Sequence, residues 1–387
     1  MPQNREYTAL GLLLAAVLAG CARKPATIPE LTAKWIDPEI GGRRVAVLSQ
    51  PQSRDARLPQ ILSIEILPGR GMNIFQMRAY LPDKGVIDLI ASPSLEEAKQ
   101  KLASDPNASF SFGGAILVPF ANRIRGALSA DGKTIQTTVN GKSVRLPANW
   151  KGKNPGAEPH AMHGLILSTA ADQVELRPGA DQATVTAVID AGDFEGHWPG
   201  NLNLTITATL EHDSFGFTVV AKNVGQEDVP VGIGWHPYFA IPSGRREQVI
   251  LKIPARSRAF VNNYDDVFPT GEIEQVFHSK YDFSDGAALG NLYLDDSFLG
   301  LPPRPVVAEI IDPAAHYGLR IKAISPEISA FQVYAPLDQA FVALEPQFNL
   351  GDPYNPVWGG RDTGMKVLKS GESVSYSVQL EIFVPNN

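Results

Sequence analysis

The sequence predicts an all-β fold, a large antiparallel β-sandwich with few short helices. Along most of the chain, apolar and polar residues alternate or β-branched residues gather, which is the pattern of strands in a sheet. Turn dipeptides separate these segments, and a single segment has the pattern of a helix. The clearest strand patterns cover residues 62–67, 204–210, 216–224, 306–312, 318–324, 330–336 and 375–384.

One hairpin can be placed from its turn. Asn140-Gly141 is a dipeptide typical of two-residue hairpin loops. It lies between the strand patterns TIQTTV at 134–139 and SVRLP at 143–147. Other turn signals between strands are Pro68-Gly69, Asp131-Gly132 and Asp285-Gly286.

Residues 92–106 form the segment with a helical pattern. Ser94 and Glu97 have the spacing of a capping box, and Pro106 ends the pattern. The sequence has no long internal repeat and no compositional break that divides it. Because all-β sandwiches reach this size, we expect one domain over residues 34–387.

Residues 1–20 are expected to be a lipoprotein signal peptide. The apolar run at 9–19 is too short to span a bilayer but has the length of a signal h-region. It leads into Leu18-Ala19-Gly20-Cys21, which resembles the lipobox of bacterial lipoproteins, whose cysteine carries the lipid. The alternative is an ordinary secretion signal with a cysteine nearby by chance.

The segment 21–33 is expected to be the lipidated Cys21 and a polar tether, with ordered chain beginning near Trp35. Acyl chains contribute about 0.8 kcal/mol per buried CH₂, so a multiply acylated cysteine anchors a protein firmly. Residue 22 is Ala rather than Asp, which favours the outer membrane. We therefore expect an exported lipoprotein that faces the periplasm or the cell surface.

The composition excludes an internal disulfide and argues against a nucleic-acid partner. Cys21 is the sole cysteine among 387 residues, which excludes an internal disulfide. The net charge is −7 and no basic block occurs, which argues against a nucleic-acid partner. A hydrophobic content of 44% is sufficient for a substantial core.

Four residues carry the candidate chemistry, each beside Gly, Pro or aromatic residues: Arg123 in PFANRIRG, His163 in HAMHG, His236 in GWHPYF and Glu345 in ALEPQFN. Two histidines and a carboxylate can move a proton from one oxygen to another. Glu345 follows the apolar strand FVAL, where partial desolvation raises the pKa of a carboxylate and makes it a usable base. Arg123 can bind two sugar oxygens at once, and the aromatic residues around His236 suit sugar C–H faces. Taken singly, each residue also fits a purely structural role.

His160 and His163 are candidate metal ligands. Zinc, however, needs three or four donors, and the sequence offers neither a second cysteine nor an HExxH helix. We therefore expect no metal and no cofactor.

Taken in order, these segments resemble the aldose 1-epimerase (galactose mutarotase) family, as a divergent bacterial lipoprotein member. The matching segments are FANRIRG, NGKSVRLPANW, PHAMHGL, GWHPYFAI, LDDSF, ALEPQFN and the closing RDTGMKVLKSGESVSYSVQLEI. The resemblance covers roughly residues 60–384 and implies the family's β-supersandwich. It also implies an isomerase that interconverts α and β anomers of a free hexose without a cofactor.

The resemblance assigns a role to each matching residue. Glu345 corresponds to the general base that takes the proton of the C1 hydroxyl, and His236 to the general acid that protonates the ring oxygen. His163 corresponds to the second histidine near that oxygen. Arg123 and Asp295 correspond to substrate-binding residues, and Gln347 is expected to line the same pocket.

Three segments depart from the commoner family pattern. GWHPYF stands where many members have NHSYF, Asp295-Asp296 replaces an Asp-His pair, and FANRIRG replaces YAGRI. The GWHPYF form resembles a divergent bacterial branch, some of whose members act on hexose 6-phosphates. Arg123, Arg125 and Arg361 are the candidates for the phosphate clamp that such a substrate requires.

Two further alternatives stay open. One is a non-catalytic sugar-binding lipoprotein on the same fold, although all matched catalytic positions are filled. The other is a glycoside hydrolase, which needs two carboxylates at the anomeric carbon, for which Asp295 and Glu345 are the candidates. An exported location favours neutral hexoses over sugar phosphates. The sequence leaves the preferred sugar and the oligomeric state open.

Overall fold

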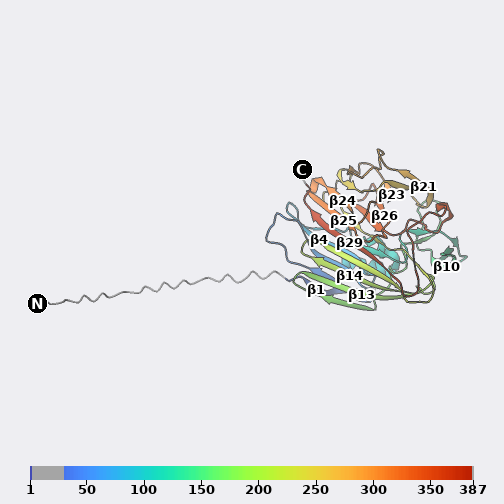
Figure 1. The fold of residues 1–387 in the computed structure, drawn as a ribbon, viewed down its shortest axis with the longest axis horizontal. Coiled ribbons are helices and arrows are strands. Elements are labelled where there is room, and N and C mark those ends of the chain that lie inside the picture. The colour runs from blue at the N-terminus through green and yellow to red at the C-terminus, as the bar shows by residue number, and fades with distance from the viewer. Residues whose placement is uncertain (2–29, 386–387) are drawn as a thin grey trace.

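The computed structural model describes Met1 and residues 30–385 (Figure 1). Antiparallel strands make up most of its regular structure, which confirms the predicted fold class. Among the described residues there is one α-helix, α1 (Leu95–Ser104), and no helix is long and apolar enough to cross a bilayer. Short 3₁₀ turns are η1 (Pro106–Phe112), η2 (Arg246–Gln248), η3 (Pro313–Ala315) and η4 (Pro356–Trp358).

Three large sheets carry the fold. The first contains, in sequence order, β1 (Thr32–Ile40), β2 (Arg43–Ser49), β3 (Gln60–Leu67), β4 (Asn73–Leu81) and β5 (Gly85–Asp88). The second has nine strands in the order β12 (Gln173–Arg177), β13 (Gln182–Gly192), β14 (Leu202–Glu211), β15 (Phe215–Asn223), β29 (Ser373–Phe383), β25 (Tyr317–Ala323), β24 (Val306–Asp312), β19 (Ile250–Lys252) and β22 (Ala287–Ala288).

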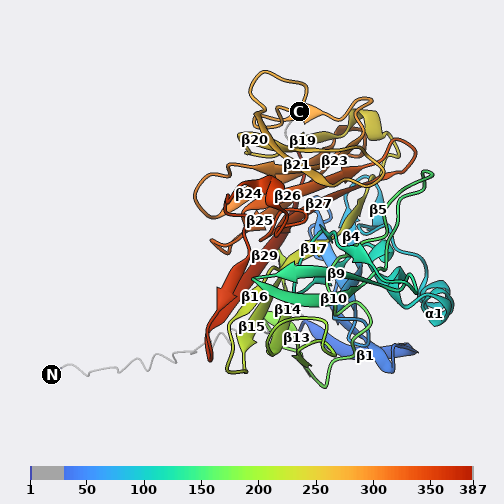
Figure 2. The ribbon, with the colours of Figure 1, turned by 90° about the vertical axis from the view of Figure 1, so that its right-hand side faces the viewer.

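The third large sheet has eight strands and, as described below, supports the candidate site. Its order is β21 (Pro269–Gln275), β20 (Ser257–Val261), β23 (Leu294–Leu299), β26 (Ala330–Ala335), β27 (Phe341–Gln347), β17 (Gly234–His236) and β6 (Ala115–Leu117), with β18 (Tyr238–Ala240) also beside β27. Figure 2 shows β20, β21 and β23 at one end of the molecule, β1, β13 and β14 at the other, and β26, β27 and β17 between them.

Smaller sheets complete the structure. They pair β10 (Lys142–Pro147) with β9 (Thr134–Val139) and β8 (Ala127–Leu128), β11 (Ala161–Met162) with β7 (Arg123–Ile124), and β16 (Val229–Val231) with β28 (Lys366–Leu368). The β9–β10 pair is the hairpin predicted from Asn140-Gly141, and both turn residues have positive φ, as a type I′ loop requires.

The three large sheets share one hydrophobic core because their strands alternate between two faces. In β14 every second residue, from Leu202 to Leu210, is buried, and the threonines between them are half-buried. Leu48 of β2, Ile206 of β14 and Val333 of β26 belong to the same buried cluster. Removing such apolar surface from water, at about 25 cal/mol per Å², is the main force that holds the sheets together.

The helix prediction is confirmed in detail. Ser94 is the N-cap of α1, its hydroxyl accepts from the Glu97 N–H at 3.3 Å, and the Glu97 carboxylate accepts from the Ser94 N–H at 2.9 Å. The helix ends at Ser104, just before Pro106. Figure 2 shows α1 at the margin of the fold, beyond β10.

The first strand begins earlier than predicted. β1 starts at Thr32, three residues before Trp35, because the preceding Leu31 is buried and its N–H donates to the Gly179 carbonyl at 2.9 Å. The expected signal peptide, the lipidation site Cys21 and the tether as far as residue 29 lie outside the described residues.

Candidate active site

Three adjacent strands of the eight-stranded sheet form the base of the site. Asp295 of β23 pairs with Tyr334 of β26, and Gln332 of β26 pairs with Glu345 of β27. Because residues two apart on a strand share a face, and paired residues on neighbouring strands do too, these four side chains lie on one side of the sheet. All four line the same pocket.

The sequence predicted that Glu345 lies at the end of a strand. In the structure it lies inside β27. β27 continues through Pro346 to Gln347, so the carboxylate is supported from both sides. On one side, Pro346 pairs with Phe331 of β26. Proline is tolerated here because the strand on the other side of β27 is broken into β17 and β18 next to Pro346. Glu345 is 2% exposed, so it is a core carboxylate and not a surface one.

The break between β17 and β18 places His236 opposite the Glu345 carboxylate. β17 pairs with β27 at Gly234 and β18 pairs with it from Tyr238, and His236 lies between these two contacts. Trp235 points the other way into the core, where its indole N–H donates to the Gly114 carbonyl at 3.1 Å. The alternation of the strand therefore leaves His236 facing the pocket.

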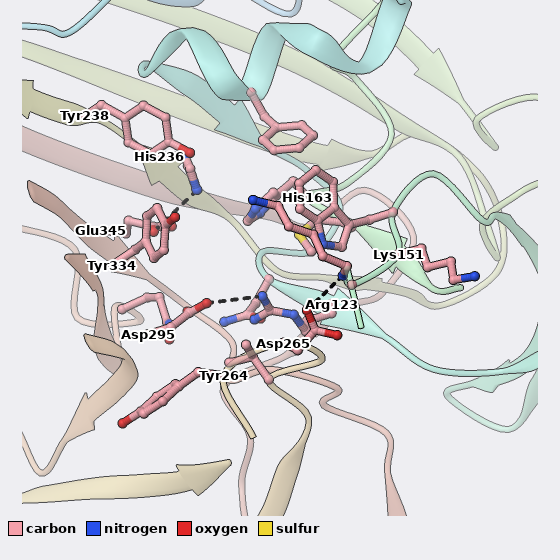
Figure 3. A pocket seen from close by; sticks show the side chains of 18 of the residues that line it. Arg123, Lys151, His163, His236, Tyr238, Tyr264, Asp265, Asp295, Tyr334 and Glu345 are labelled. Carbon is pink, nitrogen blue, oxygen red and sulfur yellow. Dashed lines mark hydrogen bonds and ion pairs between the residues drawn. The ribbon is translucent and has the colours of Figure 1, made fainter. Parts of the chain in front are cut away.

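His236 and Glu345 form a buried pair. His236 Nε2 lies 3.5 Å from Glu345 Oε1, and the two side chains are 5% and 2% exposed (Figure 3). Their other polar atoms, His236 Nδ1 and Glu345 Oε2, are buried without a hydrogen-bond partner among the described residues. Since buried polar atoms are normally paired, these two unpaired atoms mark the pair as a candidate functional site.

His163 is held beside this pair by a strained turn. β7 and β11 pair at Arg123 and Met162, and the next residue, His163, has a φ of 63° while its N–H donates to the Asn122 carbonyl at 2.8 Å. Gly164 follows because a side chain there would overlap the Val118 carbonyl oxygen, at 2.4 Å. The His163 and His236 ring centroids are 4.5 Å apart. Non-glycine residues in this conformation are uncommon and gather at functional sites.

Arg123 and Asp295 form the second charged pair of the pocket. Arg123 Nη2 lies 3.4 Å from Asp295 Oδ2, and its Nη1 donates to Asn122 Oδ1 at 2.9 Å. The Gln332 amide donates to the other Asp295 oxygen at 2.6 Å and accepts from the Ser297 hydroxyl at 2.5 Å. The Ser297 contact fixes which end of the amide faces Asp295, so the carboxylate is held by two neighbours, Arg123 and Gln332.

Burial raises the pKa values of the carboxyl groups at the base of the pocket, which we call its floor, and lowers those of the histidines. Desolvation raises the pKa of Glu345 well above its ordinary value, with a further rise from the Asp295 charge and a decrease from Arg123. Desolvation lowers the pKa of His236 to about 3 and that of His163 well below the usual range. Burial also raises the pKa of Asp295, against the opposing charge of Arg123. A strong base and weakly basic imidazoles thus stand in contact.

The pocket has a volume of about 210 Å³, and loop residues within 150–153 and 264–267 form part of its lining. Arg123, His163, His236, Asp295 and Glu345 all line it, so the structure brings five of the predicted site residues together (Figure 3). Gln347, predicted to line it too, is fully buried in β27 beside Gly234 of β17 and lies outside the lining.

Two of the three arginines proposed as a phosphate clamp are elsewhere. Arg125 pairs with Glu158 at 2.7 Å, and the Arg361 guanidinium donates to the Gly271 carbonyl. Both lie outside the pocket lining. His160 is buried against Phe268, and the described residues contain no cluster of three or more His, Cys, Asp or Glu side chains able to hold a metal ion.

Sequence reasoning missed Gln332 and did not assign Tyr334 to the site. The segment AFQVYAP was identified as a strand, and the polar Gln332 within that apolar run was the available signal. The aromatic residues Phe110 and Trp150, which also line the pocket, come from η1 and from a loop. Trp150 ends the family-like segment NGKSVRLPANW, but neither residue was assigned to the site, because tertiary structure alone brings them to the pocket.

Comparison with known proteins agrees with this site. The sequence model of the family described as aldose 1-epimerase matches residues 94–381. Among curated proteins, the chain is 26% identical over 210 residues to the maltose epimerase of Levilactobacillus brevis, covering 51% of this chain and 57% of that protein. It is 25% identical over 181 residues to the uncharacterized protein YphB of Escherichia coli K12, covering 45% and 57%. The matches thus span just over half the length of these relatives.

Solved structures share the fold. A galactose mutarotase-like protein from Clostridium acetobutylicum superposes with a TM-score of 0.72 at 18% identity, covering 92% of this chain and 99% of that one. Galactose 1-epimerase from Lactobacillus acidophilus gives a TM-score of 0.65 at 18% identity, covering 91% and 98%. The family match spans about three quarters of the chain and includes every residue of the pocket floor, so the protein belongs to the aldose 1-epimerase family.

Proposed function

We propose that the protein is an aldose 1-epimerase that interconverts the α and β anomers of a free aldose. One observation carries the proposal: Glu345 and His236 line the pocket 3.5 Å apart, and their pKa values are shifted in opposite directions. Each also has a buried polar atom without a hydrogen-bond partner among the described residues. Anomer exchange requires a proton to leave O1 while another reaches O5. A base and an acid in one pocket supply both transfers.

The pair can carry a single proton through the whole reaction. With the proton on His236, the Glu345 carboxylate takes the O1 proton as the imidazolium protonates O5, the C1–O5 bond breaks and C1=O1 forms. The proton then resides on Glu345, which is the arrangement that burial favours. After rotation about C1–C2, the reverse transfers close the ring with the other anomeric configuration. The proton count of the enzyme is restored at the end of each cycle.

The other residues bind and orient the sugar. His163 is neutral because burial lowers its pKa, so it can donate or accept a hydrogen bond near O5. Arg123 and Asp295 present a donor and an acceptor side by side, a combination that matches neighbouring sugar hydroxyls. Arg123 also lowers the pKa of Glu345, which makes the carboxylate form easier to reach.

Three alternatives receive less support from the geometry. A hexose 6-phosphate requires a cationic clamp, and two of the three candidate arginines, Arg125 and Arg361, are engaged elsewhere. Such a clamp would have to include Lys151 and Lys153, which line the pocket. A glycoside hydrolase requires a second carboxylate free to act, but Asp295 is engaged by Arg123 and Gln332. A non-catalytic sugar-binding protein has no need of a buried base with an unpaired oxygen, whose burial costs stability.

The test is proton NMR of anomer exchange, starting from freshly dissolved α-glucose and α-galactose. We expect the parent protein to accelerate exchange and Glu345→Gln to lose about 10²- to 10⁴-fold of that acceleration. Glu272→Gln, exposed on β21 and outside the pocket lining, is the matched glutamate-to-glutamine control. Saturable sugar binding without acceleration of exchange would identify a binding protein instead.

We also propose that Cys21 carries a lipid that anchors the enzyme to a membrane after export. The apolar run before the Leu-Ala-Gly-Cys segment and the absence of any other cysteine in the sequence support this. Incorporation of a fatty-acid label into the protein, lost in Cys21→Ser, is the expected result. Labelling that persists in Cys21→Ser, or is missing from the parent, would refute the anchor.

A further inference from the structure

Aromatic rings line the pocket from its floor to its mouth on one side. Tyr238 lies next to His236, with ring centroids 4.9 Å apart. From Tyr238 the rings continue to Tyr334 at 6.3 Å, to Tyr293 at 6.2 Å and to Tyr264 at 5.0 Å. The last ring, Tyr264, is 40% exposed. This wall therefore extends well beyond the groups that act on C1.

A second, shorter wall stands on another side of the pocket. Phe110 contacts both catalytic-site histidines, with centroid distances of 5.1 Å to His163 and 6.1 Å to His236. Trp150 follows at 5.4 Å from Phe110 and is 39% exposed. Each wall thus begins at the floor and ends in a large exposed ring at the mouth.

Both outer rings are fixed in place. Trp150 exchanges two backbone hydrogen bonds with His160, of 3.2 and 2.9 Å, and His160 is fully buried. The Tyr264 hydroxyl donates to the buried Asp296 carboxylate at 3.0 Å, so its phenol is tied down while the ring remains open to solvent. Rings that are held before a ligand arrives bind it without an additional ordering cost.

The two loops that carry these rings are also joined to each other. The Asp265 carboxylate accepts from the backbone N–H groups of Lys153 and Asn154, at 2.8 and 3.0 Å. Gly152 makes this approach possible, because a side chain there would meet Asp265 Oδ2 at 2.3 Å. Val267, which also lines the pocket, has a φ of 57°, a strained value for a β-branched residue. The rim is therefore a built structure rather than a loose pair of loops.

We infer that the mouth is a binding subsite for a second sugar unit, so that the substrate is the reducing end of a disaccharide or longer oligosaccharide. The inference rests on the proposed function, which places the reacting C1 at Glu345 and His236. A pyranose ring is similar in size to one aromatic ring, so a monosaccharide held at the floor leaves Trp150 and Tyr264 uncovered. A unit linked to it on the side away from C1 reaches the mouth and stacks on these rings.

Anomer exchange of maltose and cellobiose, compared with glucose, tests the inference. All three present a glucose reducing end, and the two disaccharides differ in linkage. We expect kcat/KM for at least one disaccharide to exceed that for glucose by about tenfold, the contribution of one well-placed ring contact. Trp150→Ala or Tyr264→Ala should remove most of that preference, and Trp150→Tyr, which keeps a ring, should retain part of it.

Phe277→Ala is the control, since Phe277 is 72% exposed outside the pocket lining and its loss should leave the preference at the parental value. Equal kcat/KM for glucose and both disaccharides in the parent would overturn the inference. If no sugar is epimerised, the proposed function fails first, and calorimetric binding of maltose and cellobiose to Glu345→Gln then decides separately. Binding weakened by Trp150→Ala supports the subsite, and no binding of either disaccharide refutes it.

Discussion

Two buried carboxylates of the eight-stranded sheet, Asp296 and Glu345, have opposite surroundings. Asp296 is fully buried and accepts hydrogen bonds from Arg258 at 2.6 Å, from Tyr264 at 3.0 Å and from the backbone of the preceding residue at 3.1 Å. Glu345 is buried to nearly the same degree but has His236 at 3.5 Å, and its second oxygen is unpaired within the described part of the chain.

The comparison separates a structural carboxylate from a reactive one. A buried charge that is fully hydrogen-bonded and paired stabilises the arrangement around it, and removing its partner is costly. A buried carboxylate with an unpaired oxygen raises the free energy of the folded protein and gains a partner only when a ligand arrives. Burial alone does not distinguish the two residues, whereas the count of hydrogen-bond partners does.

The largest effect on stability is expected from Asp296→Ala. The substitution leaves the Arg258 guanidinium buried with Glu274 as its remaining acidic partner, at 2.6 Å. We expect the free energy of unfolding to fall by about 3 kcal/mol, as measured by urea denaturation. A loss below about 1 kcal/mol, the range of an exposed ion pair, would show that Asp296 contributes little to the fold.

Glu345→Gln is expected to change stability in the other direction, and in a pH-dependent way. The folded-state pKa of Glu345 lies above its ordinary value of 4.5, so its contribution to stability is complete below about pH 4.5 and is lost as the pH rises through the raised pKa. Glutamine does not ionise and escapes this loss. The variant should match the parent near pH 4 and melt at a higher temperature near pH 8, with each unit of raised pKa contributing about 1.4 kcal/mol.

Thermal melts of parent and variant across that pH range test the prediction. Glu272→Gln serves as the matched control, because Glu272 is exposed on β21 and lies outside the pocket lining. A variant that is less stable than the parent at every pH would mean that the Glu345 carboxylate is well solvated or paired in the folded protein.

The pH profile of anomer exchange should lack an acid limb near the ordinary pKa of histidine. The His236–Glu345 pair is inactivated by acid only when it takes up a second proton. That proton must enter at His236, whose pKa burial lowers from 6.5 to about 3. We expect kcat/KM for α-glucose to stay nearly constant from about pH 7 down to about pH 5 while circular dichroism reports a folded protein. A half-maximal loss near pH 6.5 would contradict the buried geometry of His236.

Much of the fold was predictable because sheets with one polar face have a regular pattern. β14, β15, β24 and β29 alternate strictly and were identified from sequence. β4 was missed because both of its faces are largely buried, so its apolar residues do not alternate regularly with Asn73, Gln76 and Arg78. β7 and β11 have two residues each, too few for any periodic pattern.

The site was predictable only where family resemblance supplied long-range information. Arg123, His163, His236, Asp295 and Glu345 come from distant segments, and no local pattern indicates that they meet. Gln347 was expected in the pocket from its place two residues after Glu345, but it is fully buried in β27 beside Gly234 and lies outside the pocket lining. Asp295 and Asp296 are adjacent in sequence, but successive strand residues point to opposite faces and so have different roles.

The smallest effect is expected from Arg125→Gln, compared with Arg123→Gln two residues earlier. Arg125 pairs with Glu158 through side chains that are 42% and 53% exposed, and such pairs contribute about 0–1 kcal/mol. Arg123 is 9% exposed on its side chain, lines the pocket and pairs with the buried Asp295. We expect Arg125→Gln to keep the exchange rate of glucose within about twofold, whereas Arg123→Gln loses at least about tenfold in kcat/KM.

The same two variants also test the phosphate alternative. If the protein acted on hexose 6-phosphates through a clamp that includes Arg125, Arg125→Gln would lower glucose 6-phosphate exchange selectively and leave glucose exchange unchanged. The pairing of Arg125 with Glu158 outside the pocket lining leads us to expect equal, small effects on both sugars. Since one buried and one exposed arginine on the same short segment are compared, a difference between them reports position in the pocket rather than loss of charge.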